Sequence, residues 1–107
     1  SRFVTRLPAH EVGEAALAYL RRYGVETGHI VRGGDRLGLY YLEAGAGLRG
    51  SKVIYDRAGS SLAQLTPGEI DWEAALGGAH WFHWSGITPA LGAGPLEALA
   101  AALEAAS

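Results

Sequence analysis

Two β-patterned segments joined by a glycine-rich connection constrain the fold of this chain more than any other feature. Segments 36–43 and 52–57 are rich in Leu, Val, Ile and Tyr, and the connection 44–51 contains Gly45, Gly47 and Gly50. β-branched and aromatic residues such as Val, Ile and Tyr favour strands, and glycines supply the backbone freedom that a chain reversal needs. Segment 27–32 has the pattern of a further strand, and the following Gly33-Gly34-Asp35 predicts a tight reversal. The sequence therefore predicts a β-meander over the middle of the chain.

Helical patterns lie on both sides of this meander. A helix is expected from about Ala9 to Tyr23, with Gly24 as its C-terminal cap, and another from Pro95 to Ala106. Phe3-Val4-Thr5 predicts the end of a strand before the first helix. Apolar residues at helical spacing form one stripe on each helix: Val12, Ala16, Leu20 and Tyr23 on the first, and Leu96, Leu99 and Leu103 on the second.

Two capping patterns predict short helices between the meander and the last helix. Thr66-Pro67 followed by Glu69 has the composition of a capping box, which favours a helix start. Asp71 is expected to cap a helical turn that ends at Gly77-Gly78.

An apolar, aromatic run follows at Ala79–Ser85 and is short enough to be a buried strand, whereas Gly86–Gly94 is expected to be a loop. The expected order of elements is β-α-β-β-β-α-β-α, which indicates an α/β layer that carries an inserted sheet. With 107 residues, 49% of them hydrophobic and 19% charged, the chain has the composition of one globular domain.

Charge and cysteine content exclude several kinds of site. The chain has no cysteine, which rules out disulfides, thiolate catalysis and Cys-ligated zinc and suits the cytoplasm. A net charge of −2, no apolar run of membrane-spanning length and no signal-peptide pattern give no reason to expect nucleic acid or a membrane as partner. All nine Lys and Arg lie within residues 1–57, an asymmetry that marks either an anion-facing half or an ordinary solvated surface.

Two motifs resemble a nucleotide-binding loop and a metal site, but the secondary structure expected around them does not fit either kind of site. Gly45–Gly50 matches GxGxxG, but a β-pattern follows it where a dinucleotide-binding loop needs a helix, so a long hairpin loop is the better interpretation. His80 and His83 suggest a metal site, but an i, i+3 pair on a strand points to opposite faces. We therefore interpret both as hydrogen-bonded histidines of the core or of a sheet edge.

Tyr40, Tyr55 and Arg57 form a more useful candidate site. If segments 36–43 and 52–57 pair, Tyr55 and Arg57 share one face and Tyr40 can lie across from them, although the register stays open. Two phenols and a guanidinium could hold a small polyhydroxylated acid, with the guanidinium on the carboxylate and the phenols on the hydroxyls. The alternative is a solvated face with amphipathic tyrosines. No spacing in the chain singles out a catalytic residue.

Several segments, in order, carry a resemblance to a known family. They are RLGLYYLE (36–43), VIYDRAGS (53–60), Asp71-Trp72 and WFHWSGITPAL (81–91), and the opening Phe3–Pro8 fits as well. Together they resemble the 2-keto-3-deoxygluconate kinases (2-dehydro-3-deoxygluconokinases), which belong to the ribokinase-like, phosphofructokinase-B-type carbohydrate kinases. The resemblance covers nearly the whole chain.

The resemblance implies part of a large doubly wound α/β domain with a small inserted β-sheet lid. Within a single fragment 1–107, residues 1–32 and 59–107 would belong to the large domain and about 33–58 would form the lid hairpin. Family members transfer phosphate from ATP, with Mg²⁺, to 2-keto-3-deoxygluconate. Lid tyrosines and an arginine contact the sugar acid, and by motif match these are Tyr40, Tyr55 and Arg57. Lids of the family often pair, which implies a homo-oligomer formed through the lid sheet.

The chain departs from the family pattern in what it lacks. It has no match to the family's first strand, to its Gly-Gly substrate segment, or to the later half with the nucleotide site and the catalytic aspartate. The resemblance therefore implies an interior fragment with no catalytic, cofactor-binding or metal-binding residue, inactive by itself. Two alternatives stay open: a non-catalytic module that dimerises through its β-sheet, and a kinase for a sugar such as ribose or fructose. Arg57 favours an acid over these neutral sugars.

Overall fold

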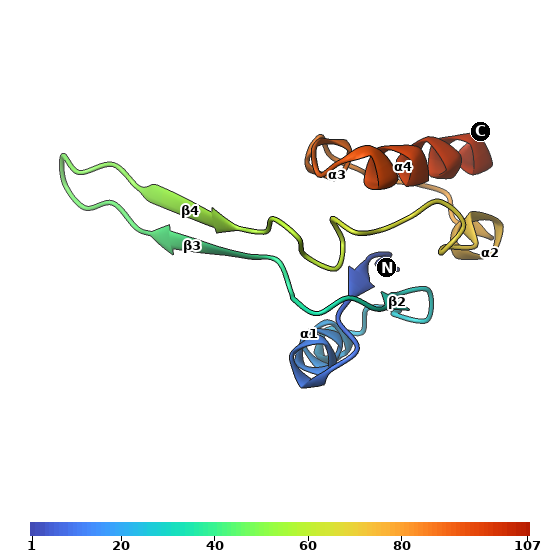
Figure 1. Cartoon of the computed structure of the whole chain (residues 1–107), viewed down its shortest axis with the longest axis horizontal. Helices are drawn as coiled ribbons and strands as arrows, with labels where there is room; N and C mark the ends of the chain where they lie inside the picture. The colour runs from blue at the N-terminus through green and yellow to red at the C-terminus, as the bar shows by residue number, and fades with distance from the viewer.

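Two separate two-stranded sheets organise the structure, a computed structural model that describes all 107 residues. A short parallel pair forms between β1 (Arg6–Leu7) and β2 (Val31–Arg32). A longer antiparallel hairpin forms between β3 (Leu39–Glu43) and β4 (Lys52–Asp56), and it projects from the rest of the chain (Figure 1). We call residues Leu39–Asp56 the arm and the remainder the body. The arm accounts for the elongated shape, which measures 47 × 28 × 27 Å.

Four helices complete the body. They are α1 (Glu11–Arg22), α2 (Trp72–Leu76), α3 (Ile87–Ala90) and α4 (Ala93–Ala106). In Figure 1, α1 lies on one side of the β1–β2 pair, and α2 and α4 lie on the other. Helix α4 packs against both α2 and α3. None of the helices has the length and apolar character that a membrane crossing needs.

The hairpin is confirmed, but the three-stranded meander is wrong. β2 pairs in parallel with β1 and not with β3, so Gly33-Gly34 leads the chain into the arm instead of closing a hairpin. Gly34 does adopt a φ of 77°, which only glycine reaches readily. The β1–β2 pair is also shorter than the expected segments, because hydrogen bonds join only a few residues, such as the Gly33 amide and the Leu7 carbonyl at 2.8 Å.

The expected strand at Ala79–Ser85 is also wrong. This segment is irregular, no strand pairs with it, and Trp81 is 93% exposed. A strand needs a neighbour to take up its backbone hydrogen bonds, which this segment does not have. The loop expected at Gly86–Gly94 is wrong in part, since α3 and the start of α4 lie within it.

Local capping patterns predicted two of the helix ends. Gly24 follows α1 with a φ of 72°, and the Asp71 carboxylate accepts a hydrogen bond of 3.0 Å from the Ala74 amide at the start of α2. The helix start expected at Thr66 is wrong. The Glu69 carboxylate does accept a hydrogen bond of 2.7 Å from the Thr66 amide, but the two residues close a turn, and the next helix, α2, starts only at Trp72.

The helices bury different faces from the ones their apolar stripes suggest. In α1 the buried residues are Gly13 and Leu17, whereas Val12 is 52% exposed and Tyr23 is 65% exposed. In α4, Leu99 is buried as part of its stripe, but the other buried residues are Pro95, Ala98 and Ala102. Small side chains let α4 approach the body closely. Leu96 and Leu103 therefore stay exposed.

The core is small and lies between α4, α2 and the segment before α2. Only 15 of the 107 residues are buried, so the body holds one limited cluster of apolar side chains and no second core. The cluster consists of Leu65, Ile70, Ala75 and Ala98, and Val4, Val31, Leu62 and Trp72 pack around it. Much apolar surface therefore remains outside the core, on the arm and along the body.

Candidate functional site

Tyr40 and Tyr55 face each other across the arm. They are direct register partners of β3 and β4, and their ring centroids lie 6.5 Å apart. Arg57, just beyond β4, lies on the same side, with its Cζ 4.5 Å from the centroid of the Tyr55 ring. The structure therefore brings together the three residues that the sequence singled out and supplies the register that the sequence left open.

A hollow of about 210 Å³ lies where the arm meets the body, and all three residues line it. Its other walls come from β1, from the base of the arm with the segments on either side of it, and from α3, and they are largely aliphatic: Leu7, Leu37, Leu39, Leu62, Ile87 and Leu91. The hollow is smaller than the roughly 300–1000 Å³ of most small-molecule sites. It can therefore hold one end of a small ligand against an aliphatic wall.

Arg57 is the cation of this hollow that is free to bind a ligand. Its guanidinium makes no hydrogen bond or ion pair within the chain. Arg6 also lines the hollow, but its Nε lies 3.0 Å from the Glu69 carboxylate and its Nη1 donates to the Ser61 carbonyl. An unpaired guanidinium retains all five of its donors for a carboxylate.

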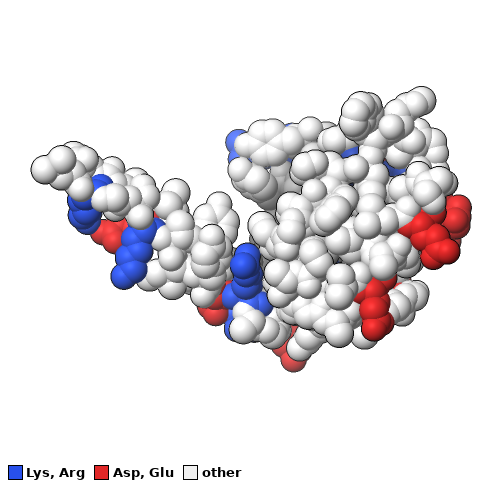
Figure 2. Space-filling model, turned by 90° about the horizontal axis from the view of Figure 1, so that it is seen from above, with Lys and Arg blue, Asp and Glu red and all other residues white.

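Most of the remaining basic side chains are neutralised locally. Five of the nine Lys and Arg form ion pairs with carboxylates of the chain: Arg2, Arg6, Arg32, Arg36 and Arg49. Figure 2 shows basic side chains along the arm and at its base with acidic ones close to them, and further acidic side chains at the end of the body away from the arm. The basic half of the sequence is therefore not one continuous anion-facing surface.

Glu69 is a structural carboxylate that binds Arg6, a residue of the hollow's lining. Its Oε2 accepts hydrogen bonds from the Thr66 amide and hydroxyl, and its Oε1 accepts one from Arg6. The bond from the Thr66 amide contributes most to holding the pKa of Glu69 below its ordinary value of 4.5, and burial opposes this effect in part. Both oxygens are occupied, so Glu69 is not placed to take a proton from a ligand.

The glycine-rich connection forms the tip of the arm, as expected of a long hairpin loop. A bridge between Ala46 and Arg49 closes it, and Gly47 has a φ of 60°. The chain continues directly into β4, and no helix N-terminus meets the loop. In Figure 1 this tip is the part of the arm furthest from the body, so it takes no part in the hollow.

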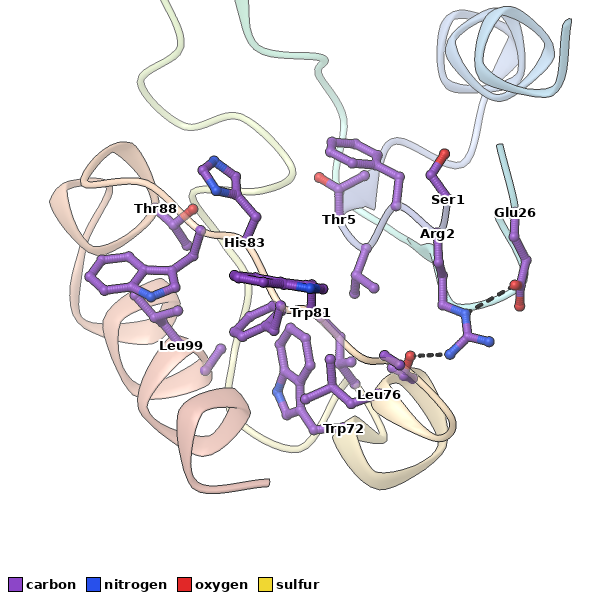
Figure 3. A pocket seen from close by; sticks show the side chains of 18 of the residues that line it. Ser1, Arg2, Thr5, Glu26, Trp72, Leu76, Trp81, His83, Thr88 and Leu99 are labelled. Carbon is purple, nitrogen blue, oxygen red and sulfur yellow. Dashed lines mark hydrogen bonds and ion pairs between the residues drawn. The ribbon is translucent and has the colours of Figure 1, made fainter. Parts of the chain in front are cut away.

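A larger groove of about 860 Å³ crosses the body and was not predicted. Figure 3 shows Trp72, Trp81 and Leu99 along it, with Arg2 at one end bound to Glu26 at 3.0 Å. The signal in the sequence was the aromatic run at 79–85, which is mainly an open wall of this groove and not a buried strand.

The two histidines of that run do not form a metal site. His80 and His83 both line the groove, and no group of three or more His, Asp or Glu lies close enough together to hold a metal ion. Both side chains are exposed and make no hydrogen bond within the chain. The interpretation of these residues as hydrogen-bonded histidines of the core or of an edge is therefore wrong.

Curated relatives match most of this chain, although no protein-family model does. 2-Dehydro-3-deoxygalactonokinase of Haloferax volcanii is 38% identical over 91 residues, and 2-dehydro-3-deoxygluconokinase of Thermoproteus tenax is 32% identical over 90 residues. These alignments cover 83% and 82% of this chain, but only 28% and 27% of the relatives.

Solved structures agree with the fold along nearly the whole chain. 2-Dehydro-3-deoxygluconokinase from Thermotoga maritima superimposes with a TM-score of 0.95 at 50% identity, covering 98% of this chain and 32% of that protein. Over this matched length the chain is similar to the PfkB-type carbohydrate kinases. A PfkB-family carbohydrate kinase from Listeria grayi gives a TM-score of 0.92 at 40% identity and again matches about a third of its own length, 33%. This confirms the family resemblance and the α/β class.

Two features of the chain bear on nucleotide and metal binding. Its glycine loop leads into a strand, and its carboxylates and histidines do not gather into a metal-ligand set. The relatives of the chain are kinases, which are phosphotransferases. What this chain offers is the hollow with Tyr40, Tyr55 and Arg57.

Proposed function

We propose that this chain is the acceptor-binding part of a kinase that transfers phosphate from ATP to a 2-keto-3-deoxy sugar acid such as 2-dehydro-3-deoxygluconate. The observation that carries the proposal is the unpaired guanidinium of Arg57, stacked on Tyr55, the register partner of Tyr40, in a hollow that can hold one end of a small ligand. The names of the relatives support it, because both curated relatives are kinases of 2-dehydro-3-deoxy sugar acids.

Each part of the hollow suits one part of such an acid. Arg57 would bind the carboxylate through two parallel N–H bonds, and the phenol groups of Tyr40 and Tyr55 would bind sugar hydroxyls. The deoxygenated carbon has no hydroxyl to satisfy, so it can lie against the aliphatic wall. A neutral sugar such as ribose or fructose would leave the Arg57 charge without a partner, which favours the acid.

Calorimetric titration of the chain with 2-dehydro-3-deoxygluconate tests this proposal. We expect binding by the wild-type chain, loss of binding in Arg57→Ala, and unchanged binding in Arg22→Ala, whose guanidinium is also unpaired but lies on α1. Stronger binding of ribose or fructose than of the acid would contradict the assignment. No ATP turnover is expected, and turnover that depends on the acid would contradict the view that catalytic groups lie outside these residues.

The groove of the body supports the proposal that the chain is one part of a larger α/β domain. Its aromatic wall is irregular backbone without a strand partner, and Trp81 is almost fully exposed. Related kinases of known structure are about three times as long as the matched region, which is 32% and 33% of their chains. We propose that further strands and helices of such a kinase cover the groove.

Complementation tests the proposed role of the groove. The part of the Thermotoga maritima kinase that this chain does not match would be mixed with the chain, and tryptophan fluorescence and acid-dependent ATP turnover would be recorded. We expect a blue shift and recovered turnover, both weakened by Trp81→Ser. A mixture that leaves the fluorescence of the chain unchanged would contradict the proposal.

A second candidate function is a module that dimerises through the arm. The exposed apolar side chains on the arm face opposite Tyr40 and Tyr55 favour it, with Tyr41 and Ile54 exposed by 56% and 54%. The outer edges of β3 and β4 are also unpaired, and such edges recruit partners. Sedimentation over a range of concentrations tests it, since a monomer at high concentration would contradict it, and a dimer abolished by Ile54→Lys would support it.

A further inference from the structure

We propose that Arg36 is a positioning residue for Arg57, and that it sets the direction in which the Arg57 guanidinium meets the carboxylate of the acid. This inference rests on the proposed function of the hollow. Arg36 lies before β3, whereas Arg57 lies just after β4, so the two residues meet at the base of the arm.

The Arg36 side chain holds the backbone on both sides of Arg57. Its Nη1 donates to the Ala58 carbonyl at 2.9 Å, and its Nη2 donates to the Asp56 carbonyl at 3.0 Å. Nη2 also forms an ion pair with the Asp56 carboxylate. The strand ladder ends at Asp56, so no β3 residue pairs with Arg57 or Ala58. Arg36 supplies contacts that the ladder no longer supplies there.

Arg36 is in turn fixed to the body. Its carbonyl accepts hydrogen bonds from the Ser61 amide at 2.9 Å and from the Ser61 hydroxyl at 3.0 Å, and Ser61 is 1% exposed. One residue therefore connects the buried turn after the arm to the two peptides that flank Arg57. Such a double attachment orders the Arg57 backbone before a ligand arrives, which lowers the entropic cost of binding.

The arm contains a matched control. Arg49 also forms an ion pair with a carboxylate, that of Glu43, but it lies at the tip and makes no backbone contact beside the site residues. Replacing Arg36 or Arg49 by Met removes one positive charge and one ion pair to a carboxylate of the arm in each case. Only the change at Arg36 removes contacts to the peptides that flank Arg57.

The first test needs no ligand. In NMR spectra, the side-chain protons of Arg57 should show the upfield ring-current shift of a group stacked on Tyr55. We expect Arg36→Met to reduce this shift, Arg36→Lys to retain part of it, and Arg49→Met to leave it unchanged. Arg57 resonances that are identical in wild type and Arg36→Met would overturn the inference.

The second test compares 2-dehydro-3-deoxygluconate with its neutral methyl ester by calorimetry. We expect Arg36→Met to weaken binding of the acid about tenfold and to leave binding of the ester nearly unchanged, because the effect acts through Arg57. Equal weakening of both ligands would indicate a merely structural role and overturn the inference. If the acid binds and depends on Arg57 but not on Arg36, this inference fails alone; if wild type binds no acid, the proposed function of the chain fails, and the ring-current result still decides the role of Arg36.

Discussion

The guanidinium of Arg57 lies over the ring of Tyr55, with its Cζ 4.5 Å from the ring centroid. A cation held over an aromatic face at a partly exposed site gains about 0.5–1 kcal/mol. The larger consequence is order, because the ring restricts a long and otherwise mobile side chain to one direction. Tyr55 therefore has two separable roles, as a surface for Arg57 and as a phenol that can bind a hydroxyl.

Two substitutions at Tyr55 separate these roles. Tyr55→Phe keeps the ring and removes the hydroxyl, so we expect binding of the sugar acid to weaken about threefold to tenfold. Tyr55→Leu also removes the aromatic face, so we expect a further loss of about twofold to fivefold. Calorimetry on both variants measures the difference, and equal affinities would show that the stack adds nothing to binding.

Gly38→Ala should disturb Arg57 without unfolding the chain. A Cβ at Gly38 would lie 3.3 Å from the Cβ atoms of Arg57 and Ser60, which is tighter than ordinary contact. We expect acid binding to weaken several-fold while the free energy of unfolding changes by less than about 1 kcal/mol. Gly50→Ala is the control, because nothing lies within 4 Å of its Cβ position and its φ is not positive. Equal affinities of the two variants would contradict the prediction.

Gly94→Ala should destabilise the body. A Cβ there would lie 2.0 Å from the Leu65 carbonyl oxygen, so α4 would have to move away from the core. We expect the free energy of unfolding to fall by about 1–3 kcal/mol in urea denaturation. Gly86→Ala should be neutral or stabilising by up to about 1 kcal/mol, because its Cβ position is free and its φ is −63°. A Gly94→Ala chain as stable as wild type would show that α4 can shift without cost.

Glu69 should make stability depend on pH in the acidic range. The pKa of Glu69 is lowered in the folded chain, chiefly by the hydrogen bond from the Thr66 amide, so the folded state favours the ionised carboxylate. Its contribution is complete above the ordinary value of 4.5 and is lost as the pH falls through the lowered value. We expect Glu69→Gln to have a lower free energy of unfolding than wild type at pH 7, and the difference between the two free energies to decrease toward pH 2. A difference in the free energy of unfolding that stays constant across this pH range would refute the stabilising role of the ionised Glu69 carboxylate.

Features that depend on neighbours in the sequence could be predicted. The Asp71 cap and the glycine after α1 involve hydrogen bonds or backbone angles within a few residues, and both occur as expected. Whether segment 79–85 forms a strand could not be predicted from neighbouring residues alone. An apolar run shows a need for burial, but whether it becomes a strand depends on a hydrogen-bonding partner, and this one has none.

In the candidate site, too, some features could be predicted from the sequence and others could not. Alternation along a strand placed Tyr55 and Arg57 on one face, and the expected pairing of the two segments allowed Tyr40 to lie across from them. Only the strand pairing in the structure gave the register that sets Tyr40 against Tyr55. The aliphatic wall that α3 contributes to the hollow also became known only from the tertiary structure. Nothing in the spacing of Arg36 pointed to its contacts on both sides of Arg57.

Patterns in the sequence were enough to predict the arm, its two faces, two of the local caps and the resemblance to the PfkB-type kinases. These depend on residue type, on alternation and on ordered motifs, all of which are properties of neighbouring residues. The tertiary structure decided that β2 joins β1, that α4 buries alanines more than leucines, and that a groove stays open along the body. The reason is physical: backbone pairing and close packing depend on which distant segments meet. The residue pattern of one segment does not show which other segment it will pair with or pack against.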